Sequence, residues 1–180
     1  MKYTTLMTAA TLAIGSAFCN GTPLEYNNKV SVGISSVSYE FSSKDALLIG
    51  GEFSFVPRND VYGFTAYAGK NFDLQNGRSV TPYVGGSFLD LDGKQHGWPV
   101  MGVRFNEDFL SWLSVGGDLI TTVSFEKETA TALTFNGPIT FHLGESRAYD
   151  ISFIPSMGLM FFDHKTTQVA GMNFKVGYRF

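Results

Sequence analysis

The chain ends in the stretch Met172-Asn173-Phe174-Lys175-Val176-Gly177-Tyr178-Arg179-Phe180. Every second residue, from Phe180 back to Met172, is apolar, and the residues between them are polar or glycine. A period of two is typical of a β-strand with one apolar and one polar face. The apolar face of such a strand meets either the core of a soluble sheet or the acyl chains of a bilayer, and alternation alone does not separate the two.

An alternating final strand that closes on an aromatic residue resembles the C-terminal strand of bacterial outer-membrane β-barrels. The resemblance implies that Phe174, Val176, Tyr178 and Phe180 form the signal read by the barrel-assembly machinery. A second stretch, Thr81-Pro82-Tyr83-Val84-Gly85-Gly86, resembles a recurring strand of small barrels related to the OmpA membrane domain and OmpX. These resemblances imply an up-and-down antiparallel barrel in the outer membrane of a Gram-negative-type bacterium, in contact with outer-membrane lipid and lipopolysaccharide.

The composition fits a single all-β domain over residues 20–180. Charged residues make up only 16% of the chain, whereas aromatic residues reach 15% and there are 20 glycines, which is typical of many short strands. Beyond the amino terminus no run approaches the roughly 18 apolar residues that a membrane helix needs. Alternating strands produce such a profile even in a membrane protein, because the two faces average out. A net charge of -3 without a basic stripe disfavours nucleic acid as a partner.

Residues 1–19 are predicted to be an export signal. Lys2 supplies the positive start, an apolar stretch follows from Leu6 to Ile14, and small residues offer cleavage after Ala17 or Cys19. A buried helix of a soluble protein and a lipidated Cys19 are the alternatives. Because Cys19 is the only cysteine, no disulfide framework is possible. A closed barrel in a bilayer is another source of stability, since every backbone group pairs with a neighbouring strand.

The alternation defines nine candidate strands, among them residues 109–125 and 130–143, with a hairpin predicted at Asn76–Gly77 and a tight turn at residues 106–108. A single-chain bacterial barrel normally has an even number of strands. Counting back from Phe180 predicts eight strands starting near Asp45, which leaves residues 30–41 outside the count; ten strands are the alternative. With the carboxyl end in the periplasm, the outward loops fall at about 57–61, 90–97, 126–129 and 162–167. The candidate aromatic-belt residues are Tyr26, Tyr62, Trp98, Tyr149 and Phe180.

The face opposite the apolar one carries six charges: Glu52, Arg104, Asp118, Asp150, Lys175 and Arg179. Three acids and three bases would be costly if unpaired in a narrow interior, so we expect them to pair with one another. An eight-stranded barrel is only wide enough for side chains to fill it, which predicts a plugged cylinder rather than an open pore. The alternative is a proton or ion pathway through these charges.

Catalytic signals are few, and we expect neither an enzyme nor a cofactor. The histidines are His96, His142 and His164, and no metalloprotease, paired-cysteine or α/β-hydrolase motif accompanies them. His164 and Thr166, close to the last strand, faintly resemble the His-x-Ser pair of outer-membrane lipid A deacylases, although threonine replaces serine and the residues that follow differ. A lipid A deacylase-like hydrolase and a soluble exported β-barrel binding protein are therefore the alternatives to a monomeric structural or surface-interacting membrane barrel.

Overall fold

The structure is a computed structural model, and it describes residues 28–43, 46–56, 61–91, 94–124, 130–144, 146–162 and 165–180. The predicted export signal, Cys19, Tyr26 and His164 lie outside these residues. Within the described ranges, no helix is long and apolar enough to cross a membrane.

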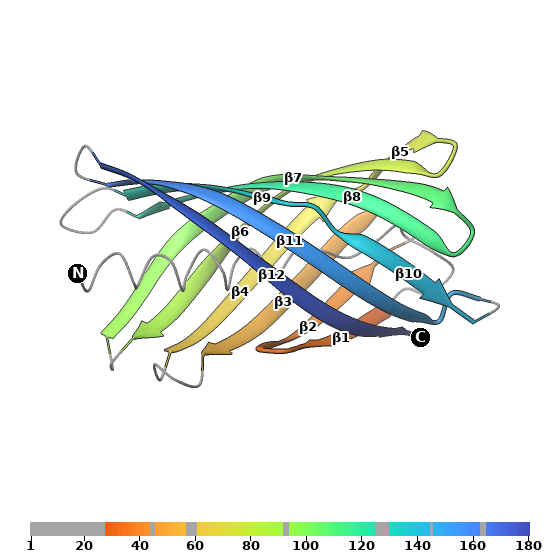
Figure 1. The fold of residues 1–180 in the computed structure, drawn as a ribbon, viewed down its shortest axis with the longest axis horizontal. Coiled ribbons are helices and arrows are strands. Elements are labelled where there is room, and N and C mark those ends of the chain that lie inside the picture. The colour runs from red at the N-terminus through yellow and green to blue at the C-terminus, as the bar shows by residue number, and fades with distance from the viewer. Residues whose placement is uncertain are drawn as a thin grey trace.

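The described residues form β-strands joined by short connections. The strands are β1 (Asn28–Gly33), β2 (Ser36–Ser42), β3 (Leu47–Val56), β4 (Val61–Lys70), β5 (Phe72–Gln75), β6 (Arg78–Leu91), β7 (Lys94–Leu110), β8 (Leu113–Ser124), β9 (Ala130–Asn136), β10 (Ile139–Leu143), β11 (Tyr149–Phe162) and β12 (Lys165–Arg179). All pairings between them are antiparallel, and the strands run obliquely around the long axis of the molecule (Figure 1).

The sheet closes on itself because the first strand pairs with the last. In the β1–β12 ladder, Lys29 lies opposite Arg179 and Val32 opposite Val176. Two of the twelve strands extend a neighbour rather than widening the ring: β5 follows β4 along β6, and β10 follows β9 between β8 and β11. Within the described residues, ten strands therefore surround the barrel. The closing ladder is short, because β1 pairs with residues 175–179 of β12, whereas the ladder between β12 and β11 runs along residues 165–178.

The prediction of eight strands is wrong, and the alternative of ten is confirmed. Residues 30–41, which the eight-strand count left out, form most of the β1–β2 hairpin, in which Val32 pairs with Val37. The alternation of apolar and polar residues is interrupted at Ser35 because the chain reverses direction there. Neither an Asn-Gly pair nor a proline marks the turn. The hairpin then joins β12 on one side and β3 on the other.

Three further boundaries differ from the sequence prediction. The polar stretch 90–97 is not a wide loop, because β6 runs to Leu91 and β7 starts at Lys94. The turn expected at residues 106–108 lies instead at Ser111–Trp112, so residues 109–125 are not one strand. The segment 130–143 breaks at residues 137–138. By contrast, the hairpin predicted at Asn76–Gly77 is confirmed, and both residues have positive φ angles.

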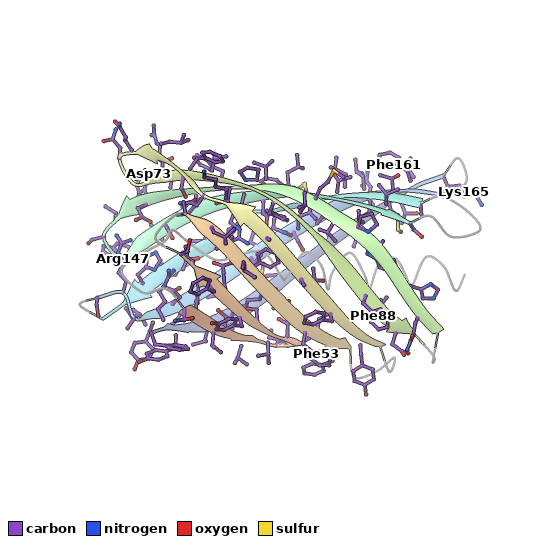
Figure 2. All side chains as sticks on the ribbon, turned by 180° about the vertical axis from the view of Figure 1, so that it is seen from behind. Phe53, Asp73, Phe88, Arg147, Phe161 and Lys165 are labelled. Atoms are coloured by element: carbon purple, nitrogen blue, oxygen red, sulfur yellow. The ribbon has the colours of Figure 1, made fainter. Side chains whose placement is uncertain are left out.

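The barrel is apolar outside and polar inside. Large apolar side chains project from the wall, among them the labelled Phe53, Phe88 and Phe161 (Figure 2). Most of the buried side chains in the interior are polar or charged. Tyr62, Tyr149 and Phe180 lie on the outer surface, as expected for belt residues, but Trp98 is only 6% exposed and shares the inner phase of β7 with Arg104. The assignment of Trp98 to the belt is therefore wrong, because its position within β7 turns the side chain into the barrel.

Candidate functional site: the polar interior

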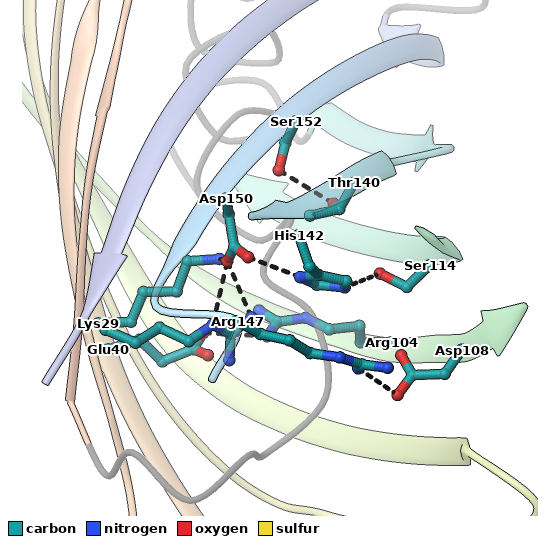
Figure 3. A network of polar contacts seen from close by, with 11 residues as sticks. Lys29, Glu40, Arg104, Asp108, Ser114, Thr140, His142, Arg147, Asp150 and Ser152 are labelled. Carbon is teal, nitrogen blue, oxygen red and sulfur yellow. Dashed lines mark hydrogen bonds and ion pairs between the residues drawn. The ribbon is translucent and has the colours of Figure 1, made fainter. Parts of the chain in front are cut away.

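Asp150, near the start of β11, is the centre of one interior cluster. Its Oδ2 lies 2.5 Å from Nζ of Lys29 on β1 and 2.9 Å from a terminal guanidinium nitrogen of Arg179 on β12. Its Oδ1 lies 2.7 Å from Nδ1 of His142 on β10 (Figure 3). This carboxylate on β11 thus binds side chains from three other strands, including both sides of the β1–β12 seam that closes the barrel.

Gly177 makes room for this cluster. It lies opposite Ser31 on β1 and Asp150 on β11. A Cβ at this position would lie 2.8 Å from Cε of Lys29, so any larger residue would collide with the lysine stem. The absent side chain therefore allows Lys29 to pass over β12 and reach the carboxylate.

His142 extends the cluster to β8. Its Nε2 lies 2.9 Å from Oγ of Ser114, and Figure 3 shows the imidazole between Ser114 and Asp150. A hydroxyl, an imidazole and a carboxylate in this order are the parts of an activated nucleophile. Here, however, Ser114 has no exposed surface, and Asp150 also binds two cations.

A second cluster surrounds the guanidinium of Arg104 on β7. It lies 3.0 Å from Oε2 of Glu40 on β2 and 3.9 Å from Oδ2 of Asp118 on β8. The rings of Tyr67 and Tyr83 lie 5.7 and 5.9 Å from the guanidinium carbon, within cation–π range. The Tyr67 hydroxyl donates a hydrogen bond of 2.7 Å to Glu40, and the Tyr83 hydroxyl donates one of 2.7 Å to Asp118. Four ring positions separate β2 from β7, so the Glu40–Arg104 pair crosses the interior.

Glycines on the inner face shape this crossing. Gly50 on β3 lies directly opposite Tyr67 on β4, and Gly102 on β7 lies directly opposite Tyr83 on β6. A Cβ at either glycine would lie 2.3 Å from the tyrosine hydroxyl oxygen. Each ring therefore lies across a neighbouring strand and brings its hydroxyl to a carboxylate further around the barrel.

A third ion pair joins Lys175 on β12 to Glu52 on β3. The Nζ to Oε2 distance is 2.5 Å, and both side chains are almost completely buried. The lysine crosses β1 and β2 to reach its partner, and a Cβ at Gly33 would lie 3.2 Å from its Cγ. The absence of a side chain at Gly33 thus gives Lys175 its path along the inner wall.

Near the end of the barrel that carries the Asp150 cluster, Arg147 binds Asp108. A terminal guanidinium nitrogen of Arg147 lies 2.7 Å from Oδ2 of Asp108, and both side chains are partly exposed. Arg147 belongs to the connection before β11, whereas Asp108 is close to the end of β7. This pair therefore ties two hairpins together at the mouth of the barrel.

All six side chains predicted for the interior charge network are buried inside the barrel. The structure joins Glu52 to Lys175, Asp150 to Arg179, and Arg104 to Asp118. The sequence analysis did not include Lys29, Glu40 or His142 in this network. Glu40 fell in the segment left outside the eight-strand count. Continuing the alternation of Val30 and Val32 back to Lys29 would have placed the lysine on the inner face, whereas Glu40 follows a phase that changes at the turn between β1 and β2.

Of the two residues considered for hydrolysis, only Thr166 lies among the described residues. Thr166 is exposed near the start of β12, and its proposed partner His164 lies outside the described residues. His96 lies on β7 with its ring centroid 6.4 Å from that of Trp98. Among the described residues, no group of three His, Cys, Asp or Glu side chains is arranged to hold a metal ion.

The closed ring, polar interior and apolar outer wall define a β-barrel with the reverse polarity of a soluble one. No protein-family model and no curated protein matches the chain. Among solved structures, a KdgM porin is similar with 10% identity and a TM-score of 0.41, covering 85% of this chain and 97% of the porin. A KdgM porin in complex with disordered oligogalacturonate is similar with 11% identity, the same TM-score and the same coverage.

Proposed function

We propose that the chain is an integral outer-membrane β-barrel whose interior is closed by paired charges and whose role is structural or surface-interactive. The observation that carries this proposal is the reversed polarity of the wall. In water, so many adjoining exposed apolar side chains would promote association. In a bilayer the same side chains meet acyl chains, and the ladders around the ring pair backbone groups that lipid cannot satisfy.

Aromatic side chains at the end of the barrel near Phe180 support this location. Tyr149, Tyr178 and Phe180 form a contiguous outer group, with ring centroids 5.1 Å apart between Tyr149 and Tyr178 and 5.9 Å apart between Tyr178 and Phe180. Trp112 stacks on Phe141 further around the wall. Such side chains are enriched where a membrane protein meets the head groups.

The C-terminal strand is proposed to act as the assembly signal. Val176, Tyr178 and Phe180 are exposed on the outer wall, and Phe174 shares their phase. Export by residues 1–19, recognition by the barrel-assembly machinery, and contact with lipid and lipopolysaccharide belong to the same proposal. The chain would act as a monomer.

The ion pairs favour a closed interior over a diffusion pore. The Glu40–Arg104 contact crosses the barrel, with Tyr67 and Tyr83 packed beside it, and Lys175–Glu52 spans three strand-to-strand steps of the ring. Because these groups are buried and paired, moving them aside to admit a solute would leave charges without partners. We propose that the barrel excludes solutes under resting conditions.

The short connections favour an envelope role over adhesion. The hairpins at the end opposite Phe180 are connected by residues 34–35, 57–60, 92–93, 125–129 and 163–164. Adhesive barrels usually reach their partners through long outward loops. We therefore expect any surface contact of this chain to be made close to the barrel rim.

Three measurements test this proposal. The exported protein should need detergent for extraction and should migrate differently in SDS with and without boiling. In a planar bilayer it should give no stable conductance. Release by osmotic shock with identical migration would instead identify a soluble exported barrel, and a steady conductance would show an open interior.

We propose that Ser114, His142 and Asp150 are structural rather than catalytic. Ser114 is completely enclosed, and the carboxylate that would orient the imidazole is shared with Lys29 and Arg179. Folded protein should therefore remain unlabelled by a fluorophosphonate probe. Labelling that is lost in Ser114→Ala, while the heat-modifiable gel shift is retained, would establish a reactive serine and contradict this interpretation.

A further inference from the structure

The outer wall has a groove where β7, β8 and β9 meet. Its volume is about 470 Å³, and its walls are mainly apolar, formed by Val103, Phe105, Phe109, Leu119 and Phe135. The groove exists because Gly117 faces outward between Val115 and Leu119, in register with Phe105. A side chain at Gly117 would begin to fill it, since a Cβ there would lie 3.3 Å from the ring of Phe135.

One wall of the groove also contains a charge. Glu107 lines it and continues the outward phase of Phe105 and Phe109. Nε and a terminal nitrogen of Arg78 lie 2.9 and 2.7 Å from Oε1 of Glu107. The Arg78 side chain is 52% exposed and that of Glu107 is 33% exposed, so both charges remain accessible beside the apolar groove.

The depth of this pair suits a lipid head group. Arg78 and Glu107 lie close to the hairpin ends that also carry Phe109 and Trp112, both of which are exposed. This is the end of the barrel that carries Phe180, which the proposed topology places on the periplasmic side. The leaflet on that side of an outer membrane consists of phospholipid.

We propose that the groove binds one membrane phospholipid with a zwitterionic ethanolamine head group. An acyl chain lies over Gly117 between Phe105 and Phe135, the phosphate faces Arg78, and the ammonium faces Glu107. Adjacent positive and negative side chains complement this head group better than they complement an anionic glycerol head group. The inference rests on the proposed membrane location, and it adds a specific lipid site to that location.

Native mass spectrometry of the full chain tests the site. Protein reconstituted with equal amounts of dioleoyl phosphatidylethanolamine and dioleoyl phosphatidylglycerol is released from detergent, and the lipids that remain bound are identified by mass. The test variant is Gly117→Leu, which fills the groove. The matched control is Gly86→Leu, on the same outer surface, where a Cβ would meet only the carbonyl oxygen of Trp98, at 3.9 Å.

Wild type and Gly86→Leu should each retain one phosphatidylethanolamine, and Gly117→Leu should retain at least tenfold less. The double variant Arg78→Gln, Glu107→Gln should still bind lipid but lose its preference for phosphatidylethanolamine over phosphatidylglycerol. Equal retention by the two leucine variants would overturn the proposal. So would a dimer that Gly117→Leu dissociates, since a second copy would then occupy the groove.

Failure of this inference is distinguishable from failure of the proposed function. A protein that keeps its heat-modifiable shift but holds no specific lipid is a membrane barrel without this site. A protein that is soluble without detergent contradicts the membrane location itself. The gel assay should therefore accompany each mass measurement.

Discussion

Neutralising Asp150 should be among the most destabilising single changes to this barrel. Asp150→Asn preserves the shape of the side chain but removes the negative charge shared by Lys29, Arg179 and His142. Lys29 and Arg179 are at most 6% exposed as side chains, so water cannot replace the lost anion. Removing one partner of a buried ion pair costs about 3 to 5 kcal/mol.

The cost can be measured by unfolding the protein in urea in phospholipid vesicles. With a slope of about 2 kcal/mol/M, the expected loss moves the midpoint by about 1.5 to 2.5 M. Trp98 inside the barrel and Trp112 on its outer surface report on the two environments by fluorescence. Unfolding and refolding curves must coincide for the free energy to be valid.

Two variants control for this prediction. Glu107→Gln breaks a partly exposed pair with Arg78 and should cost less than about 1 kcal/mol. Adding Lys29→Met to Asp150→Asn removes one of the two cations that lose their carboxylate partner, and it should recover part of the stability. If Asp150→Asn costs no more than Glu107→Gln, the interior cluster does not stabilise the barrel and the reasoning fails.

Three further changes probe the wall and the interior. Leu119→Arg, whose neighbours across both ladders are apolar, should cost about 2 to 4 kcal/mol near the bilayer midplane, measured by the same unfolding assay. Gly50→Ala should displace the ring of Tyr67 and cost about 1 to 3 kcal/mol, because the added methyl group would overlap the ring. Replacing Glu40 and Arg104 together by alanine should open a path through the barrel, which planar-bilayer recordings would detect as a conductance that the wild type lacks.

Each of these has a matched comparison. Gln168→Arg, at a polar outer position beside Leu159, should be close to neutral, and an equal cost for Leu119→Arg and Gln168→Arg would contradict the assigned lipid face. Adding Tyr67→Ala to Gly50→Ala should relieve the overlap. If the variant with alanine at both Glu40 and Arg104 gives no conductance, other side chains close the interior.

The alternation of the chain was enough to place the six predicted charges on the inner face, although it did not place Trp98 there. A strand has a period of two whatever it pairs with, so Glu52, Asp118 and Lys175 share the phase opposite the apolar residues. The hairpin at Asn76–Gly77 was predictable for a similar local reason, because both residues accept positive φ. The all-β class follows from this pattern, whereas the antiparallel barrel was implied by the resemblance of the last strand and of residues 81–86 to strands of outer-membrane barrels.

Only the tertiary structure decided the number of strands and the partner of each charge. The turns after Gly33 and at Ser111–Trp112 contain neither proline nor an Asn-Gly pair, and each includes a large apolar residue, Ile34 or Trp112. The local signal was therefore too weak to divide those segments. Lys175 finds Glu52 three ring positions away, and Arg104 finds Glu40 across the barrel, since closure brings distant strands together. The sequence determined the faces because side-chain direction is local, whereas the pairing of the charges depends on the curvature and register of the whole ring.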